Sequence, residues 1–362
     1  MQPEPSRFPE RLSKVREHLL KDRCEALIIL DMNNIRYLTG FTGGSGALLL
    51  DDARSILLVD GRYITQAREE SPQAEIFECR DKMEGVAEIL ATFGAKTVGF
   101  ESAAISFENY GKLKEKINDV RLEPIPNDGS GMRAIKDESE VALLREAAAK
   151  ASETLVSMLN AIRPGVMERD VALELEYMMR RSGAGGVSFP TIVASGVNSA
   201  LPHATPGARK LARGDVIVID FGTVYGGYHS DETCTFVLGV ASSRQKEVYG
   251  VVKEAHDRAV AAVKAGIPCC EIDRIARDCM NEGGLEPFFS HAAGHGIGLD
   301  IHEPPKMSAS SKAVLEAGMV ITIEPGVYIP GLWGVRIEDM VLVKKNGCEV
   351  LTKMGKDFTL LN

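Results

Sequence analysis

Two stretches in the C-terminal half of the chain, residues 220–231 and 324–338, each predict a β-hairpin with carboxylates flanking a glycine-rich turn. The pairs are Asp220 with Asp231, symmetric about the point between Tyr225 and Gly226, and Glu324 with Glu338, symmetric about Gly331. A regular antiparallel hairpin would place each pair on directly opposed residues, roughly 5 Å apart at Cβ. Like charges so placed destabilise a sheet unless a cation lies between them, so the hairpins predict a metal site.

Three of the seven histidines, at positions 291, 295 and 302, lie within twelve residues, and His203 shortly precedes the first hairpin. Glycines at 294, 296 and 298 surround this cluster and would allow close approach of the backbone. Four carboxylates with one imidazole suit Mn²⁺, or Co²⁺, Fe²⁺ or Zn²⁺, at a two-metal site better than a structural zinc. Two metals about 3.5–4 Å apart hold a water as hydroxide near neutral pH, a centre that hydrolyses amides or phosphate esters.

Each of these residues also has a simpler interpretation. Asp220 alone would fit a strand-end aspartate that faces water, and a lone histidine is usually a surface or satisfied core residue, as expected for His18 and His256. His229 is expected to be structural. Asp220-Phe-Gly spells the kinase magnesium motif, but the partner motifs of a kinase are absent. Residues 294–298 do not match a dinucleotide fingerprint, and the histidines at 291 and 295 lack the glutamate of a zincin helix.

Length and composition set the frame for these sites. A chain of 362 residues predicts two domains, and the turn formers at 126–131 predict their boundary, giving residues 1–131 and 132–362. The net charge of −9 argues against a nucleic-acid partner. No apolar run has the length of a membrane span, no secretory signal is visible, and seven scattered cysteines indicate reduced thiols, so we expect a cytoplasmic protein without a membrane partner.

The order of predicted elements gives a fold class for each part. Helices expected over 10–22, 62–70, 82–93 and 106–118 alternate with strand-like runs, which predicts an α/β domain with a turn at Asn33-Asn34. The glycines at 43–46 predict a plain turn, since no lysine and no helix follow as in a phosphate loop. The second part reads helix, helix, hairpin twice, an α+β arrangement with an internal duplication. Its first helix is expected to begin at a capping box of Asp137 and Glu140.

Taken together, the chain resembles the pita-bread metallopeptidases, specifically the Xaa-Pro aminopeptidases and prolidases. The residues that fall in order on that family's metal ligands are Asp220, Asp231, His295, Glu324 and Glu338. The resemblance extends to residues 132–140, 198–203 and 34–42, so it implies a creatinase-like N-terminal α/β domain followed by a pita-bread catalytic domain. The family often has Thr-Arg-Thr where this chain has Thr-Cys-Thr, which places Cys234 near the site but not among the ligands.

The resemblance implies a metal-dependent exopeptidase that cleaves between an N-terminal residue and a following proline, through a hydroxide bridging two metals, most often Mn²⁺. Glu324 would be both ligand and proton acceptor, His203 and His302 would stabilise the oxyanion, and His291 and Arg336 would hold the proline side. Arg336 is expected on the same strand face as Glu338. Proline-containing peptides would be the substrates, and a homodimer is expected, with the N-terminal domain restricting the cleft or forming the dimer contact.

Several alternatives remain at the level of sequence. An Xaa-Pro aminopeptidase is favoured by residues 34–42, while a prolidase, limited to dipeptides, would use the same chemistry. A non-catalytic peptide-binding module or a metal-free creatinase-like hydrolase would lack ligands that are all present here. A methionine aminopeptidase shares the ligands but generally lacks a long N-terminal domain.

Overall fold

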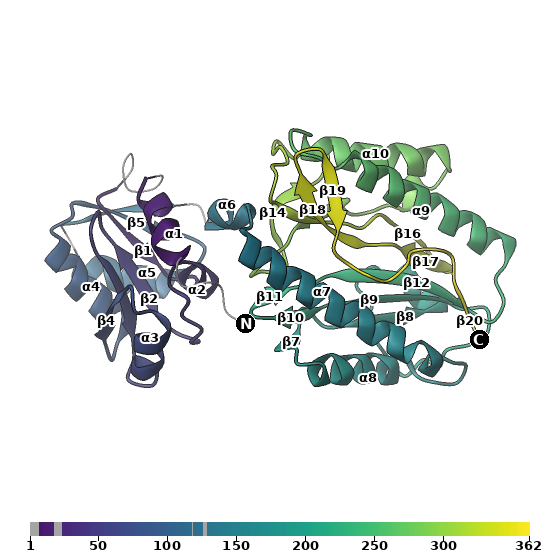
Figure 1. Cartoon of the computed structure of the whole chain (residues 1–362), viewed down its shortest axis with the longest axis horizontal. Helices are drawn as coiled ribbons and strands as arrows, with labels where there is room; N and C mark the ends of the chain where they lie inside the picture. Colours follow the sequence, from purple (N-terminus) through teal and green to yellow (C-terminus); the bar gives the residue numbers. More distant parts are fainter. Residues whose placement is uncertain (1–6, 18–23, 118, 126–128) are drawn as a thin grey trace. The chain divides into compact units, whose positions relative to one another are not determined.

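The computed structural model describes residues 7–17, 24–117, 119–125 and 129–362. Contacts divide the chain into two compact units, one within residues 2–133 and the other comprising residues 134–362 (Figure 1). The helix predicted over 10–22 is observed as α1 (Phe8–Val15), and its C-terminal part, with His18, lies outside the described residues. Within the described ranges, no helix has the length and apolar character needed to cross a membrane.

The first unit is built on a six-stranded mixed sheet in the order β4-β3-β2-β1-β5-β6. Its strands are β1 (Ala26–Ile29), β2 (Ala47–Leu50), β3 (Ser55–Val59), β4 (Glu75–Glu78), β5 (Thr97–Glu101) and β6 (Arg121–Ile125). Its other helices are α2 (Met32–Thr39), α3 (Ile64–Glu70), α4 (Lys82–Phe93) and α5 (Phe107–Lys116), with α6 (Gly129–Ala134) at the unit boundary. The central strands are buried on both faces, which explains their continuous apolar runs. The predicted α/β class is confirmed.

The turn predicted at Asn33-Asn34 is wrong, because both residues lie in the first turn of α2. Asp31 caps this helix, and its carboxylate accepts the backbone N–H of Asn34. The Asn34 side chain donates to the buried Glu101 at 2.5 Å, and Glu101 also accepts two backbone N–H groups at the end of β1. The asparagine motif that favoured an aminopeptidase therefore has a structural task inside the first unit.

The second unit repeats one order of elements, as predicted. Its first half comprises α7 (Glu138–Met158), α8 (Glu168–Arg181), β7 (Gly186–Val187), β8 (Ile192–Ser195), β9 (Val216–Phe221), β10 (Thr223–Tyr225), β11 (Tyr228–His229) and β12 (Glu232–Leu238). Its second half comprises α9 (Ser243–Ala262), α10 (Cys269–Glu282), β13 (Gly294–Gly296), β14 (Glu303–Met307), β15 (Val320–Ile323), β16 (Gly326–Ile329), β17 (Trp333–Arg336), β18 (Asp339–Lys344), β19 (Gly347–Val350) and β20 (Leu360–Leu361). The capping box of Asp137 and Glu140 at the start of α7 is confirmed.

Each half packs its helix pair against a sheet. Helices α7 and α8 share one apolar core with β9 and β12, which belong to the sheet β20-β12-β9-β8. Helices α9 and α10 share a second core with β15 and β18, which belong to the sheet β14-β13-β15-β18-β19. Figure 1 shows strands from both halves between the two helix pairs of this unit. The sheet faces turned away from the helices are left to form a site.

The first hairpin differs from the predicted register. Strands β9 and β12 pair Asp220 with Thr233 rather than with Asp231. The turn residues are Gly226 and Gly227, one position further along than predicted, and both have the positive φ of a type I′ turn. Because side chains alternate with a period of two, this two-residue slip keeps both aspartates on one face, and both line the same pocket.

The second hairpin has the predicted register. Ile323 pairs with Asp339 on one side and Gly326 with Arg336 on the other, which places Glu324 opposite Glu338. The backbone N–H of Glu338 donates to the carbonyl of Thr233 at 3.2 Å, so the two hairpins are joined beside their acidic residues.

Candidate metal centre and active site

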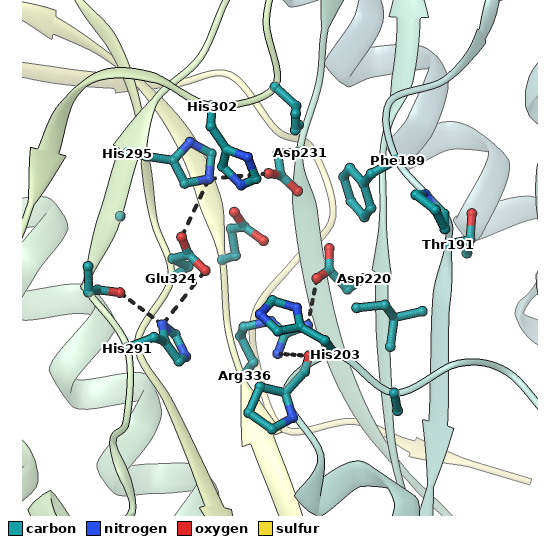
Figure 2. Close-up of a pocket in the computed structure, with 18 of the residues that line it drawn as sticks. Phe189, Thr191, His203, Asp220, Asp231, His291, His295, His302, Glu324 and Arg336 are labelled. Carbon is teal, nitrogen blue, oxygen red and sulfur yellow. Dashed lines mark hydrogen bonds and ion pairs between the residues drawn. The ribbon is translucent and has the colours of Figure 1, made fainter. Parts of the chain in front are cut away.

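One pocket of about 810 Å³ in the second unit is lined by every site residue that the sequence analysis named. These residues are His203, Asp220, Asp231, His291, His295, His302, Glu324, Arg336 and Glu338. Figure 2 shows His295, His302 and Asp231 gathered on one side of this space, with His203, Asp220 and Arg336 on another and His291 near Glu324. Residues separated by more than a hundred positions thus meet at one cavity.

The centre of the pocket is a cluster of three predicted ligands. Asp231, His295 and Glu338 each place a ligand atom within 4.8 Å of the others. Nε2 of His295 lies 3.6 Å from Oδ2 of Asp231 and 3.5 Å from Oε1 of Glu324. The Thr233 hydroxyl donates to Glu338 at 2.7 Å and so orients that carboxylate. The cluster therefore presents one nitrogen and several oxygens to a common space.

The orientation of His295 fits a cation in that space. Its Nδ1 lies 2.9 Å from the carbonyl oxygen of Gly296, which can only accept, so Nδ1 carries the proton. Burial lowers the pKa of His295 to about 4, which keeps the ring neutral. Its Nε2 lone pair consequently faces two carboxylates, an arrangement that is unfavourable unless a positive ion lies between them.

The carboxylates lead to the same conclusion. Burial, followed by repulsion from the neighbouring acidic groups, raises the pKa of Asp231 and of Glu338 well above the ordinary range. Burial also raises the pKa of Glu324, to about 7. In addition, Oδ1 of Asp220 is buried without a hydrogen-bond partner in the described chain. Acidic oxygens so crowded and dry fit divalent cations, which would supply the missing positive charge.

Arg336 connects the acidic cluster to a residue that sequence reasoning missed. Its guanidinium pairs with Oδ2 of Asp220 at 2.5 Å and donates to the Tyr328 hydroxyl at 2.6 Å. Tyr328 in turn lies 2.9 Å from Nε2 of His291. Arg336 also donates to the Thr233 hydroxyl at 3.1 Å, the group that orients Glu338. The expected same-face position of Arg336 and Glu338 is thus consistent with their shared contact.

The remaining histidines have different surroundings. His203 and His302 are exposed at the pocket, and the His302 ring lies 4.5 Å from the His295 ring in an edge-to-face arrangement. His291 is partly buried, and burial lowers its pKa to about 4. His256 is a core residue as expected, with Nδ1 3.1 Å from Asp257 and Nε2 3.2 Å from Asp339. His291, like His295, therefore lines the pocket as a neutral ring beside the acidic groups.

Glycines permit the close packing around His295, as predicted. A Cβ atom on Gly294 would lie 1.9 Å from the carbonyl oxygen of Thr322, and one on Gly296 would lie 2.3 Å from that of Pro304. Cys234, the departure from the family pattern, packs in the core beneath the sheet, with Sγ 3.4 Å from Nζ of Lys356. It does not line the pocket, so the substitution leaves the pocket wall unchanged.

Lys306 is a second pocket residue without a sequence signal. It pairs directly with His295 across β13 and β14, so its side chain projects from the same face of the sheet. Its side chain is exposed, and the described part of the chain contains no ion pair to it. Only the pairing of β13 with β14 shows that the ammonium group of Lys306 belongs to the same pocket as the acidic cluster.

Comparison with known proteins agrees with this geometry. Residues 142–345 match metallopeptidase family M24, and residues 11–135 match the creatinase/prolidase N-terminal domain. The chain is 38% identical to an Xaa-Pro dipeptidase from Pyrococcus horikoshii over 96% of this chain and 98% of the relative.

Solved structures give the same result. An Xaa-Pro dipeptidase from Bacillus anthracis superposes with a TM-score of 0.95 at 38% identity, covering 98% of this chain and all of that one. An X-Pro aminopeptidase from Thermotoga maritima superposes with a TM-score of 0.87 at 35% identity, covering 93% and 97%. The chain therefore belongs to metallopeptidase family M24, as an enzyme that joins a creatinase-type N-terminal domain to a pita-bread catalytic domain.

Proposed function

We propose that this protein is a metal-dependent Xaa-Pro dipeptidase, which hydrolyses the amide bond between an N-terminal residue and a C-terminal proline. The observation that carries the proposal is a buried acidic cluster that includes His295, with Lys306, which has no ion pair among the described residues, on the neighbouring strand. Relatives over nearly the whole chain, named as Xaa-Pro dipeptidases, support this substrate class. The aminopeptidase is the second candidate, supported by the similar Thermotoga enzyme.

The proposed ligands are Asp220, Asp231, His295, Glu324 and Glu338, which would hold two divalent ions, with Mn²⁺ as the expected metal. When bound, such ions polarise a carbonyl and lower the pKa of water. The donor set, with one imidazole among carboxylates, is consistent with this hard, oxygen-preferring metal. The orphaned Oδ1 of Asp220 supplies a further donor beyond the three-residue cluster.

The protein's own groups account for the proton movements. Glu324, which lines the pocket beside His295, accepts the proton of the attacking water and then returns it to the departing proline nitrogen. His203 and His302 are placed at the pocket surface to donate hydrogen bonds to the carbonyl oxygen as it gains negative charge. Arg336 and Tyr328 hold His291 in place, and His291 contacts the proline side of the substrate.

The preference for dipeptides follows from Lys306. A dipeptide bound with its scissile carbonyl at the acidic cluster has its terminal carboxylate only one residue away. A lysine on the strand next to His295 is in position to pair with that carboxylate. In a longer peptide the same position holds a neutral amide, which makes a weaker hydrogen bond with the ammonium group.

A chelator experiment tests the metal and the substrate class together. Treatment with EDTA should abolish hydrolysis of Ala-Pro, and added Mn²⁺ should restore it, because the carboxylate cluster is otherwise uncompensated. The measurement is the release of the N-terminal alanine from Ala-Pro, from Ala-Ala and from Ala-Pro-Ala. Undiminished hydrolysis after chelation would contradict the metal proposal, and equal rates on all three peptides would contradict the Xaa-Pro proposal.

Replacing Lys306 with methionine tests the dipeptide preference. Loss of the charge should lower kcat/KM for Ala-Pro by about 10–100-fold, the equivalent of 1.5–3 kcal/mol for a hydrogen bond to a charged group. The rate for Ala-Pro-amide, which lacks the carboxylate, should change less than about twofold. The matched control is Lys312→Met, another exposed lysine, which does not line the pocket. Equal losses of kcat/KM on both substrates would show that Lys306 does not bind the terminal carboxylate of the dipeptide.

Three further expectations stay proposals. We keep the functional boundary between residues 131 and 132, a homodimeric assembly, and a cytoplasmic location, all argued from the sequence. Light scattering during size exclusion would test the homodimer, with a monomer of 39.2 kDa as the contrary result.

A further inference from the structure

A buried ion pair that includes the pocket residue Glu303 is not explained by the proposed chemistry. Nζ of Lys136 lies 3.0 Å from Oε2 of Glu303, and both side chains are 1% exposed. Lys136 precedes helix α7, whereas Glu303 directly follows His302 and begins β14. A charged pair so completely removed from water carries a large desolvation penalty and is weak evidence for a purely stabilising role. Its position beside His302 points to another role.

The Glu303 carboxylate is inserted into the turn that leads to His302. Its Oε1 accepts the backbone N–H of Asp300 at 3.2 Å. A Cβ atom on Gly298 would lie 2.6 Å from Oε2 and 2.8 Å from Oε1, so only glycine leaves room for the carboxylate there. The turn is closed by the N–H of Gly298, which donates to the carbonyl of Asp300 at 3.0 Å. The conformation of residues 298–302 thus depends on where this carboxylate lies.

Lys136 fixes the carboxylate from a rigid support. Its backbone N–H donates to the carbonyl of Gly318 at 2.9 Å, and the preceding residue forms an isolated bridge with Met319 at the start of β15. Its ammonium group also donates to the carbonyl of Ala134 at 3.3 Å. The cation is therefore anchored next to the sheet that carries His295, and it fixes the side chain of Glu303 at the start of β14 in the same sheet.

We infer that Lys136 and Glu303 are positioning residues, which hold the turn at residues 298–302 so that His302 faces the substrate carbonyl across from His295. The inference rests on the proposed function of His302, whose ring lies 4.5 Å from that of His295. His302 itself is exposed, and we find no hydrogen bond to its ring within the described ranges. Its position is consequently set by the backbone of the turn, which is where the carboxylate acts.

A set of methionine variants separates positioning from stability. Lys136→Met removes the cation that pairs with the buried carboxylate of Glu303 and should lower the Tm by about 5–10 °C. The double variant Lys136→Met/Glu303→Met removes both charges and should recover most of that Tm, because apolar residues replace a buried pair at little cost. We expect its kcat for Ala-Pro to stay about 10–100-fold low, with KM changed less than about twofold. Lys136→Arg, which keeps the charge, should retain most of the activity.

Hydrogen exchange provides a readout that does not depend on activity. In the double variant, amides of residues 297–302 should exchange at least about tenfold faster, while those of β9 keep their native rates. The matched control is Arg145→Met/Glu349→Met, which removes a half-exposed ion pair between α7 and β19, outside the pocket, and should change neither kcat nor exchange.

The outcomes are distinct. A double variant that recovers kcat and native exchange together with its Tm would overturn the inference, since the pair would then only stabilise the fold. If the wild-type enzyme cleaves no Xaa-Pro peptide, the proposed function fails, and the exchange rates still decide whether the pair holds the turn. Should the double variant not fold, the single variant Lys136→Met still removes the group that fixes the carboxylate, and native exchange at residues 297–302 in it would equally overturn the inference.

Discussion

Replacing Asp231 with asparagine should lower kcat/KM for Ala-Pro by more than about 100-fold, beyond the 10–100-fold usual for residues that only support a ligand. Asp231 is 6% exposed and lies 3.6 Å from Nε2 of His295, in the cluster with Glu338. An amide presents a neutral oxygen where the site is arranged for an anion, so both the affinity for Mn²⁺ and the rate should fall. The measurement combines steady-state kinetics with the metal content of the purified protein.

The same substitution should not destabilise the metal-free protein, although it lowers the activity of the metal-bound enzyme. Asp231 is buried beside Glu338, Asp220 and Glu324, which repel it. Removing one charge from this cluster should raise or maintain the Tm in EDTA, while the increase in Tm on adding Mn²⁺ should shrink. Glu316→Gln, at an exposed position outside the pocket, is the control and should leave both values unchanged. An Asp231→Asn variant with full metal content and full activity would disprove the ligand assignment.

Replacing Arg336 with methionine should destabilise the protein by about 3–5 kcal/mol, the usual cost of leaving a buried charge without its partner. The Arg336 side chain is 5% exposed, and its loss would leave Asp220 unpaired in an already acidic pocket. Activity should fall as well, because Tyr328 and Thr233 would lose the donor that orders them around His291 and Glu338. Urea unfolding measures the change in stability. Steady-state kinetics of the folded fraction measure the change in activity.

An exposed arginine provides the comparison for that result. Arg274 forms ion pairs with Glu271 and Asp278 on the outer face of α10, and its side chain is 57% exposed. Arg274→Met should therefore shift the urea midpoint very little, since water and salt screen exposed pairs. If Arg336→Met were equally mild, the guanidinium would not be the counter-ion of Asp220. Tyr328→Phe, which removes one acceptor, should lie between the two.

Asp220 and Glu324 could be identified from sequence because each follows a strongly apolar run, and Asp231 and Glu338 because each lies across a glycine-containing turn from one of them. Such runs as 216–219 and 320–323 are typical of buried strands, and a carboxylate at the end of a buried strand requires a counter-charge. The pairing register of the first hairpin was not predicted correctly. The first hairpin slipped by two residues because its turn is formed by Gly226 and Gly227, yet the period of two kept the faces correct.

The supporting residues could not be predicted in the same way. Tyr328 reaches His291 and Arg336 only after the second hairpin folds back toward the loop that follows α10. Lys306 lies opposite His295 because two short strands pair with an irregular register. The hydrophobicity pattern of the sequence does not predict this pairing. Lys136 and Glu303 are separated by 167 positions and meet in the interior. These contacts depend on how elements pack, which local sequence does not encode.

By itself, the sequence determined the two-part α/β and α+β organisation, the duplicated order of elements, and the acidic and imidazole side chains of the site. It could do so because hydrophobic periodicity, apolar runs and turn residues determine local structure over a few neighbouring positions. Only the tertiary structure decided which of these side chains share a face, that Arg336 and Lys306 lie beside them, and that Lys136 pairs with Glu303. The physical reason is that electrostatic energy in a buried pocket depends on distances of a few ångströms between residues far apart in the chain.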